Sequence, residues 1–274
     1  MLSHAPPATI GVSRPRSTLQ LVEESVNATV TNRRHVPFSG VNNLRDLGGY
    51  TTESGKVTQW RRVFRSDSPH NFTSGDLEVF DVMGIGVIYD LRRRAEREED
   101  PGPRPCKHVE LPSRQVFATD PSTLRTRDDG ERWLFEDYCG MLEVAGPVFG
   151  RLFTEFAESE GPVMFHCMGG KDRTGMTAAL LLSCLGVDRQ TVLDDYELTS
   201  HYSGPERVPH VVDLFVAGGI TRDAAIGMLS TPRWAMESAL DRLESHYGGI
   251  ESYLHGPGGM DKDALESLRD RLLG

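Results

Sequence analysis

A short apolar segment, a glycine-bearing turn and a longer apolar segment follow one another directly in the middle of the chain. Residues 162–166 have the length and character of a buried strand, and residues 175–185 are long enough for a buried helix. Gly169 and Gly170 lie in the turn between them, where glycine permits a tight backbone path. A strand that runs through such a turn into a helix is typical of α/β folds, whose binding sites lie at the carboxyl ends of strands.

The surrounding sequence favours one α/β domain built around this unit. Further strands are predicted at residues 59–65, 86–91 and 107–111, and Ser74 is expected to cap a helix over residues 76–83. After the turn, apolar residues recur mainly at helical spacing to the end of the chain. We therefore predict a central, mostly parallel sheet flanked by helices, with a helical C-terminal third.

The chain is expected to consist of a short lead-in and one domain. Residues 1–37 are rich in proline and polar residues and are predicted to be a flexible lead-in, so the domain would cover residues 38–274. Within this domain, the charged stretch at residues 92–100 is interpreted as the solvated face of a helix.

The overall charge narrows what the protein can bind. With 40 Asp and Glu residues against 30 Lys and Arg residues, the net charge of -10 has the wrong sign for binding nucleic acid through its phosphates. No apolar run is long enough to span a bilayer. The four cysteines include no Cys-x-x-Cys pair, and we expect neither a metal nor a cofactor. Because the N-terminus lacks a secretion signal, a cytoplasmic location is expected, with signal-less secretion left open.

The turn and the start of the following helix carry the chemically active residues. Free backbone N–H groups at the start of a helix form an anion site, and Cys167 is expected at its base. Thiols at helix N-termini near Arg or Lys ionise more readily than free thiols, so we expect Cys167 to attack phosphorus as a thiolate and form a cysteinyl phosphate. Arg173, further along the loop, offers a planar fork for bidentate phosphate binding that lysine cannot supply.

The other residues of the turn are predicted to support this reaction. We expect the Thr174 hydroxyl to donate to the Cys167 sulfur, and His166 to order the loop through backbone hydrogen bonds. Lys171 is expected to add positive charge at the rim. The residues predicted to bind the phosphate are Met168, Gly169, Gly170, Lys171, Thr174 and Gly175.

A core cysteine, a Walker loop and a zinc site are the alternatives to an anion-binding loop in this segment. A lone cysteine at a strand end is usually a buried core residue, but the arginine, threonine and glycines that follow Cys167 argue against that role. A Walker loop would need glycine at Phe165 and Ser or Thr at Asp172. A zinc site would need further ligands at close spacing, which the segment lacks.

Residues 166–175 read His-Cys-Met-Gly-Gly-Lys-Asp-Arg-Thr-Gly and resemble the Cys-x5-Arg-Thr/Ser loop of the protein tyrosine phosphatase superfamily. More narrowly, they are similar to the atypical bacterial PtpB-like branch of tyrosine and phosphoinositide phosphatases. Further similar segments are residues 43–50, residues 64–66, residues 90–92 with Glu96, and residues 247–254. The resemblance covers residues 38–272 and implies a phosphatase domain over residues 38–274.

The resemblance also bears on the general acid. The sequence contains no Trp-Pro-Asp tripeptide, which carries the acid in ordinary tyrosine phosphatases. The PtpB-like branch places this role on the loop aspartate, here Asp172, which would protonate the leaving oxygen and then activate water. Two alternatives stay open: Asp172 as the N-cap of the following helix, and Asp90 as the acid. Asp90 could equally fix Arg173 or the loop by hydrogen bonds.

The function that the resemblance implies is a protein-tyrosine phosphatase that hydrolyses phosphomonoesters, with phosphoinositide or dual specificity left open. Its partners would be a phosphorylated protein, lipid or small molecule, and the sequence predicts no oligomeric state. The alternatives are a phosphatase dedicated to a sugar or nucleoside phosphate, and a pseudophosphatase that only binds phosphate. By the same resemblance, residues 201–231 are predicted to form a helical lid, with a packed helical subdomain as the alternative.

Overall fold

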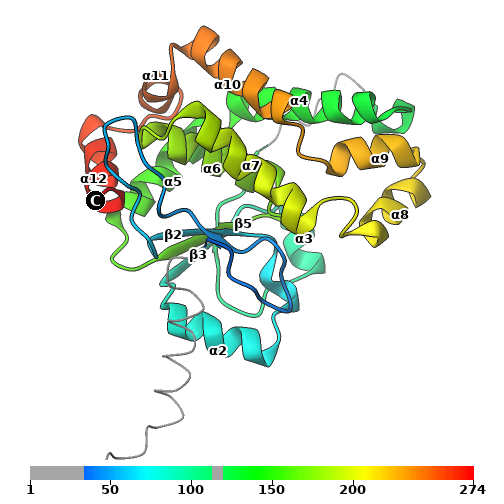
Figure 1. Cartoon of the computed structure of the whole chain (residues 1–274), viewed down its shortest axis with the longest axis horizontal. Helices are drawn as coiled ribbons and strands as arrows, with labels where there is room; N and C mark the ends of the chain where they lie inside the picture. The colour runs from blue at the N-terminus through cyan, green and yellow to red at the C-terminus, as the bar shows by residue number, and fades with distance from the viewer. Residues whose placement is uncertain (1–33, 113–119) are drawn as a thin grey trace, which may run out of the picture.

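The computed structural model describes residues 34–112 and 120–274, and its centre is a five-stranded sheet (Figure 1). The strand order is β1-β2-β5-β3-β4. The strands are β1 Arg45–Asp46, β2 Val63–Ser66, β3 Val87–Asp90, β4 Lys107–His108 and β5 Val163–His166. β1 runs antiparallel to β2, and the other pairs are parallel. The predicted α/β fold with a mostly parallel sheet is confirmed.

Helices cover both sides of the sheet and make up the C-terminal part of the chain. They are α2 Ser74–Met83, α3 Arg94–Glu99, α4 Arg127–Val144, α5 Gly146–Glu158, α6 Asp172–Cys184, α7 Arg189–Ser203, α8 Pro209–Ala217, α9 Arg222–Leu229, α10 Arg233–Tyr247, α11 Ile250–His255 and α12 Lys262–Leu272. In Figure 1, α2 lies on one side of the sheet, and α6 and α7 lie on the other. The helical C-terminal third is confirmed. Within the two described ranges, no helix has the length and apolar character that crossing a membrane requires.

Alternate residues of the central strands pack into two apolar clusters. Ile88 and Met164 pack with Phe80 of α2 in the smaller cluster. Tyr89 and Phe165 belong to the larger cluster, which includes the apolar residues of α5 and α6. Because side chains alternate between the faces of a strand, a sheet covered on both sides needs continuous apolar runs, as the sequence of β5 shows.

The carboxyl ends of the three central strands lie level with one another. Ser66 of β2 pairs with His166 of β5, and His166 pairs with Asp90 of β3, both in parallel register. Parallel strands that end level bring the residues that follow them to one edge of the sheet. Cys167, which follows β5, lies at this edge.

Two predicted boundaries near the start of the domain are wrong. The strand expected at residues 59–65 is shortened to β2, because Arg61 has a positive φ of 61° that interrupts the extended backbone. The N-cap of α2 is Thr73 and not Ser74, since the Thr73 hydroxyl accepts from Asp76 N in a capping box.

The fold also begins earlier than the expected lead-in allows. Val36 is buried, and its backbone N–H donates to Leu44 O at 3.0 Å. Residues 34–37 therefore belong to the folded part, and residues 1–33 of the predicted lead-in lie outside the described residues.

The long helix α4 is not predicted by the sequence, because its charged first half and its glycines hide the apolar spacing. One of these glycines lies at a close contact with α9. A Cβ on Gly130 would lie 2.3 Å from Ala224 O, and a Cβ on Gly227 would lie 2.2 Å from Arg127 O. The two helices therefore pack backbone against backbone, which requires glycine at both positions.

Candidate active site

Cys167 is the first residue after β5, at the start of the loop that leads into α6. The residue is 2% exposed and belongs to the larger apolar cluster. Gly170 turns the loop with a φ of 63°, and a Cβ at this position would lie 2.6 Å from Asp67 N. The loop can follow this path only because position 170 is glycine.

Residues in and next to β1 and β2 hold the backbone of this loop. Asn43 Nδ2 donates to Gly170 O at 3.0 Å, and Arg65 Nη2 donates to the same oxygen at 2.8 Å. Ser68 N donates to Met168 O at 2.9 Å. The surrounding protein thus engages carbonyl oxygens of the loop, an arrangement that suits a loop whose N–H groups bind an anion.

Behind these contacts lies a buried ionic cluster of Arg45, Tyr50, Arg65 and Asp195, which we call the buried cluster. Arg45 Nε lies 3.1 Å from Asp195 Oδ1, and Arg65 Nη1 lies 2.7 Å from Asp195 Oδ2. Tyr50 OH donates to Asp195 Oδ1 at 2.9 Å. Burial alone would raise the pKa of Asp195, but the two guanidinium groups hold that pKa below its ordinary value. A charged Asp195 therefore ties α7 to β1 and β2.

Arg173 lies in the first turn of α6, and Glu96 of α3 holds its guanidinium. Nη1 donates to Glu96 Oε2 at 2.7 Å, and Nη2 donates to Oε1 at 2.8 Å. Burial would raise the pKa of Glu96, but the bonds from Arg173 lower it to about 2. The interpretation of residues 92–100 as only a solvated face is therefore wrong for Glu96. Nη1 also donates to Leu91 O at 3.5 Å, which leaves Nε–H and one Nη2–H of Arg173 for a phosphate.

Asp90 ends β3 in an ion pair with Arg92 and does not hold Arg173, contrary to one of its expected roles. Arg92 donates to the Asp90 carboxylate through its backbone N at 3.0 Å and through Nη2 at 2.9 Å. Because both side chains are buried, this pair fixes the carboxyl end of β3 beside the loop. The role of Asp90 as an alternative acid stays a prediction.

His166 is buried directly before Cys167. Its Nδ1 lies 3.1 Å from Cys167 O, and because a carbonyl oxygen only accepts, Nδ1 carries the hydrogen. Burial lowers the pKa of His166 to about 4, although the negative charge of Asp90 acts to raise that pKa. The imidazole is therefore neutral at pH 7, which fits the loop-ordering role predicted for it.

Asp172 is the first residue of α6, and its side chain is 33% exposed. Oδ1 accepts from Tyr138 OH at 2.8 Å and lies 3.0 Å from Lys171 Nζ. The N-cap position belongs to Lys171, and within the described chain no side-chain bond caps this helix. The N-cap alternative for Asp172 is therefore wrong. A partly exposed carboxyl beside Arg173 can instead exchange a proton with a bound ester.

Two other residues of the turn differ from their expected placement. Lys171 is buried and does not lie at the rim, because Nζ donates to Met228 O at 2.7 Å and to Ser230 O at 3.0 Å. These bonds tie the turn to the end of α9. Thr174 is also buried, and its hydroxyl has no hydrogen-bond partner among the described residues, so the expected bond to Cys167 is not formed.

The structure adds Glu96, Tyr138 and Asp195 to the residues expected around the loop. Among the residues it describes, no cluster of side chains is placed to hold a metal ion. Glu96 lies in a segment that resembles the phosphatase family, so the sequence did indicate that this residue belongs near the site. The sequence did not indicate a role for Tyr138, because the sequence pattern does not predict α4. Asp195 lies in the predicted helical region, but helical spacing does not reveal its partners.

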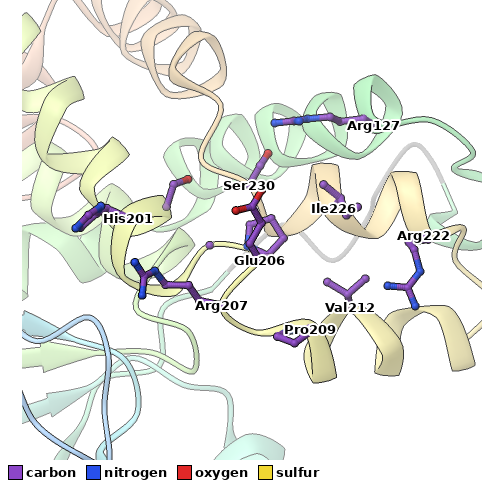
Figure 2. Close-up of a pocket in the computed structure, with 12 residues that line it drawn as sticks. Arg127, His201, Glu206, Arg207, Pro209, Val212, Arg222, Ile226 and Ser230 are labelled. Carbon is purple, nitrogen blue, oxygen red and sulfur yellow. The ribbon is translucent and has the colours of Figure 1, made fainter.

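A cavity of about 730 Å³ lies between α7, α8, α9 and the start of α4, and no residue of the Cys167 loop lines it (Figure 2). His201, Arg207 and Ser230 are among its lining residues. The segment predicted as a lid, residues 201–231, includes α8 and α9. The contact with α4 fixes α9, whereas α8 leaves Leu214 68% exposed. Movement of this segment stays a prediction.

The chain is similar to phosphatases from several bacteria. A Cupriavidus necator protein that is provisionally named a tyrosine-protein phosphatase is 28% identical over 250 residues, which cover 87% of each chain. The tyrosine-protein phosphatase of Nostoc commune is 32% identical over 209 residues, or 73% of this chain and 70% of its own. The triple specificity protein phosphatase PtpB of Mycobacterium tuberculosis is 29% identical over 124 residues, or 41% of this chain and 44% of its own.

Among solved structures, P. aeruginosa TpbA superposes with a TM-score of 0.32 and 18% identity over 63% of this chain and 89% of its own. This superposition is too weak to bear on the site. The sequence model of the tyrosine phosphatase family, in contrast, matches residues 36–274, which include the Cys167 loop. The chain therefore belongs to the tyrosine phosphatase family.

Proposed function

We propose that this protein is a protein-tyrosine phosphatase that works through a phosphate bonded to Cys167. The observation that carries the proposal is the placement of Cys167, Asp172 and Arg173 in one short loop at the start of α6. The helix start supplies free N–H groups and a positive dipole end, and Arg173 adds a charged fork. These groups suit a phosphate dianion.

In the first step, the Cys167 sulfur attacks phosphorus. The S–P bond forms while the bond from phosphorus to the ester oxygen breaks, and the leaving oxygen takes the proton of Asp172. Arg173 and the backbone N–H groups of residues 168–174 hold the equatorial oxygens, on which charge accumulates, whereas Gly175 N donates to Lys171 O at 2.7 Å. The products are the cysteinyl phosphate and the free hydroxyl compound.

In the second step, water attacks the phosphorus of the cysteinyl phosphate. Asp172, now a carboxylate, takes a proton from that water, and the S–P bond breaks with its electron pair returning to sulfur. The Thr174 hydroxyl, which has no hydrogen-bond partner in the part of the chain that the structure describes, is available to stabilise the departing sulfur. His166 and Asp90 keep supporting roles, since they hold the strand ends on which the loop stands.

The depth of the nucleophile supports phosphotyrosine as the substrate. Cys167 is only 2% exposed, so we expect its sulfur to be reached best by a phosphate that extends well beyond the surface of its carrier. Phosphotyrosine holds its phosphate on a rigid ring, further from the peptide backbone than phosphoserine does. Phosphorylated lipids and small molecules are the alternatives that an assay must separate.

Turnover of a substrate panel tests the proposal. We expect phosphotyrosine peptides to give a higher kcat/KM than phosphoserine peptides, phosphoinositides, and sugar or nucleoside monophosphates. The variant Cys167→Ser should bind the ester but retain less than about 1% of turnover, because serine is not ionised at neutral pH. Higher residual turnover would remove Cys167 from the nucleophile role. A higher kcat/KM for a lipid or metabolite would leave the cysteinyl-phosphate mechanism standing but would contradict phosphotyrosine as the substrate.

A further inference from the structure

The two oxygen atoms of the Asp172 carboxyl group have different surroundings. Oδ1 accepts from the Tyr138 hydroxyl at 2.8 Å and lies 3.0 Å from the Lys171 ammonium. Among the described residues, Oδ2 has no such donor. One oxygen is thus engaged by the protein, and the other is available to the substrate.

Tyr138 itself is held by a second tyrosine. Its hydroxyl oxygen lies 2.7 Å from Tyr196 OH, and both side chains are buried. Tyr138 has a single hydroxyl hydrogen, which it donates to Asp172, so Tyr196 must donate to Tyr138. The ring of Tyr196 also packs on α6, where a Cβ on Gly175 would lie 3.3 Å from it. The line of hydroxyl groups therefore runs from α7 through α4 to the start of α6.

Lys171 fixes the same oxygen from within the loop. Its ammonium group also donates to Met228 O and Ser230 O, so its position does not depend on Asp172 alone. An ammonium group only donates hydrogen bonds. Lys171 Nζ therefore cannot accept a hydrogen from Asp172 Oδ1, and Tyr138 OH could accept it only if both tyrosine hydroxyls reversed their hydrogen bonds.

We propose that Tyr138 is a positioning residue which, with Lys171, keeps Asp172 Oδ1 as an acceptor, so that Oδ2 carries the proton given to the leaving group. This inference rests on the proposed role of Asp172 as the acid. During the first step the Oδ2–H bond breaks and a hydrogen–oxygen bond forms on the leaving group. The negative charge that remains on Asp172 is then shared with an oxygen that already has two donors.

The test compares Tyr138→Phe with Asp172→Asn on two substrates, an alkyl phosphate and an activated aryl phosphate. Asp172→Asn should lower kcat/KM, which reports the first step, by about 10²-fold to 10⁴-fold on the alkyl phosphate and much less on the aryl phosphate, whose leaving group scarcely needs a proton. Tyr138→Phe should show the same pattern in kcat/KM at about tenfold, since it removes one hydrogen bond to a charged group.

Tyr196→Phe is the matched control, because it removes a buried hydroxyl from the same pair but leaves the bond between Tyr138 and Asp172. Its loss on the alkyl phosphate should be smaller than that of Tyr138→Phe. The double variant Tyr138→Phe/Asp172→Asn should show the same difference between the two substrates as Asp172→Asn alone, because the proton that Tyr138 positions is already absent. Thermal unfolding of each variant separates a loss of fold from a loss of positioning.

Two results would overturn the inference while leaving Asp172 as the acid. One is a Tyr138→Phe loss that is equal on both substrates, and the other is a loss no larger than that of Tyr196→Phe. If Asp172→Asn itself showed no dependence on the leaving group, the inference and the acid assignment would both fall. The activity of Cys167→Ser would then decide separately whether the cysteinyl-phosphate chemistry stands.

Discussion

Two ionic clusters hold the loop after β5, and they differ in exposure. The charged side chains of the buried cluster are at most 1% exposed. The second cluster, which we call the open cluster, consists of Glu96, Tyr138, Lys171, Asp172 and Arg173. In it, the side chain of Asp172 is 33% exposed and that of Arg173 is 14% exposed.

The difference separates charges that hold the fold from charges that can act. Both carboxylate oxygens of Asp195 accept from arginine or tyrosine, so a substrate would find no free acceptor there. In the open cluster, Asp172 Oδ2 and Arg173 Nε have no bonded partner among the described residues. A saturated buried pair fixes geometry, whereas a partly satisfied pair in reach of solvent can bind an anion or exchange a proton.

Removing the negative charge of the buried cluster should have the largest effect on stability. Asp195→Asn leaves Arg45 and Arg65 buried without a counter-ion, which should lower the free energy of unfolding by about 3–5 kcal/mol in urea unfolding. The matched control is Asp194→Asn on the same helix. Its pair with Arg233 is exposed and should contribute less than about 1 kcal/mol. Equal losses in the two variants would contradict the division into two clusters.

A change in the open cluster should lower turnover more than stability. Arg173→Lys keeps the charge but loses the planar fork, so kcat/KM should fall by about 10²-fold to 10³-fold, nearly as far as in Arg173→Ala. The control Arg94→Lys, on the exposed side of α3, should leave kcat/KM unchanged. A lysine variant with more than about a tenth of wild-type turnover would show that bidentate binding is the wrong description.

A buried carboxyl beside the open cluster should give an effect on stability that is spread over a range of pH. Burial and then the charge of Asp172 raise the pKa of Asp137 from 3.8 to about 7. Between these values the folded protein keeps a proton that the unfolded chain has lost. Stability should therefore fall as pH rises through this range, with a contribution from Asp137 of at most about 1.4 kcal/mol per pH unit.

Asp137→Asn should remove this contribution. The variant should match the wild type below the ordinary pKa of the carboxyl and exceed its free energy of unfolding above the raised pKa. Urea unfolding at a series of pH values measures the difference. The exposed control Asp128→Asn should leave the profile of the wild type unchanged. Parallel profiles of the wild type and Asp137→Asn would show that Asp137 does not hold the proton.

The separation of contacting residues along the chain explains which parts of the fold and the site the sequence could predict. β5, the loop and α6 are adjacent in the chain, so local pattern predicts the fold around Cys167 and the candidate residues of the loop. The partners of those residues are distant: Arg173 and Glu96 are 77 positions apart, and Lys171 and Met228 are 57 apart. Spacing along the chain carries no information about such pairs. The expected place of Lys171 at the rim is wrong for this reason.

The proposed reaction requires a covalent bond between Cys167 and phosphorus during turnover. In Asp172→Asn, an activated aryl group should still leave readily, whereas attack by water lacks its base, so the phosphorylated enzyme should accumulate. Acid quenching, proteolysis and mass spectrometry should then find one phosphoryl group on the peptide that contains Cys167, and none on the same peptide of a Cys167→Ser/Asp172→Asn variant. A phosphoryl group on another residue, or turnover without any phosphorylated peptide, would contradict the central claim.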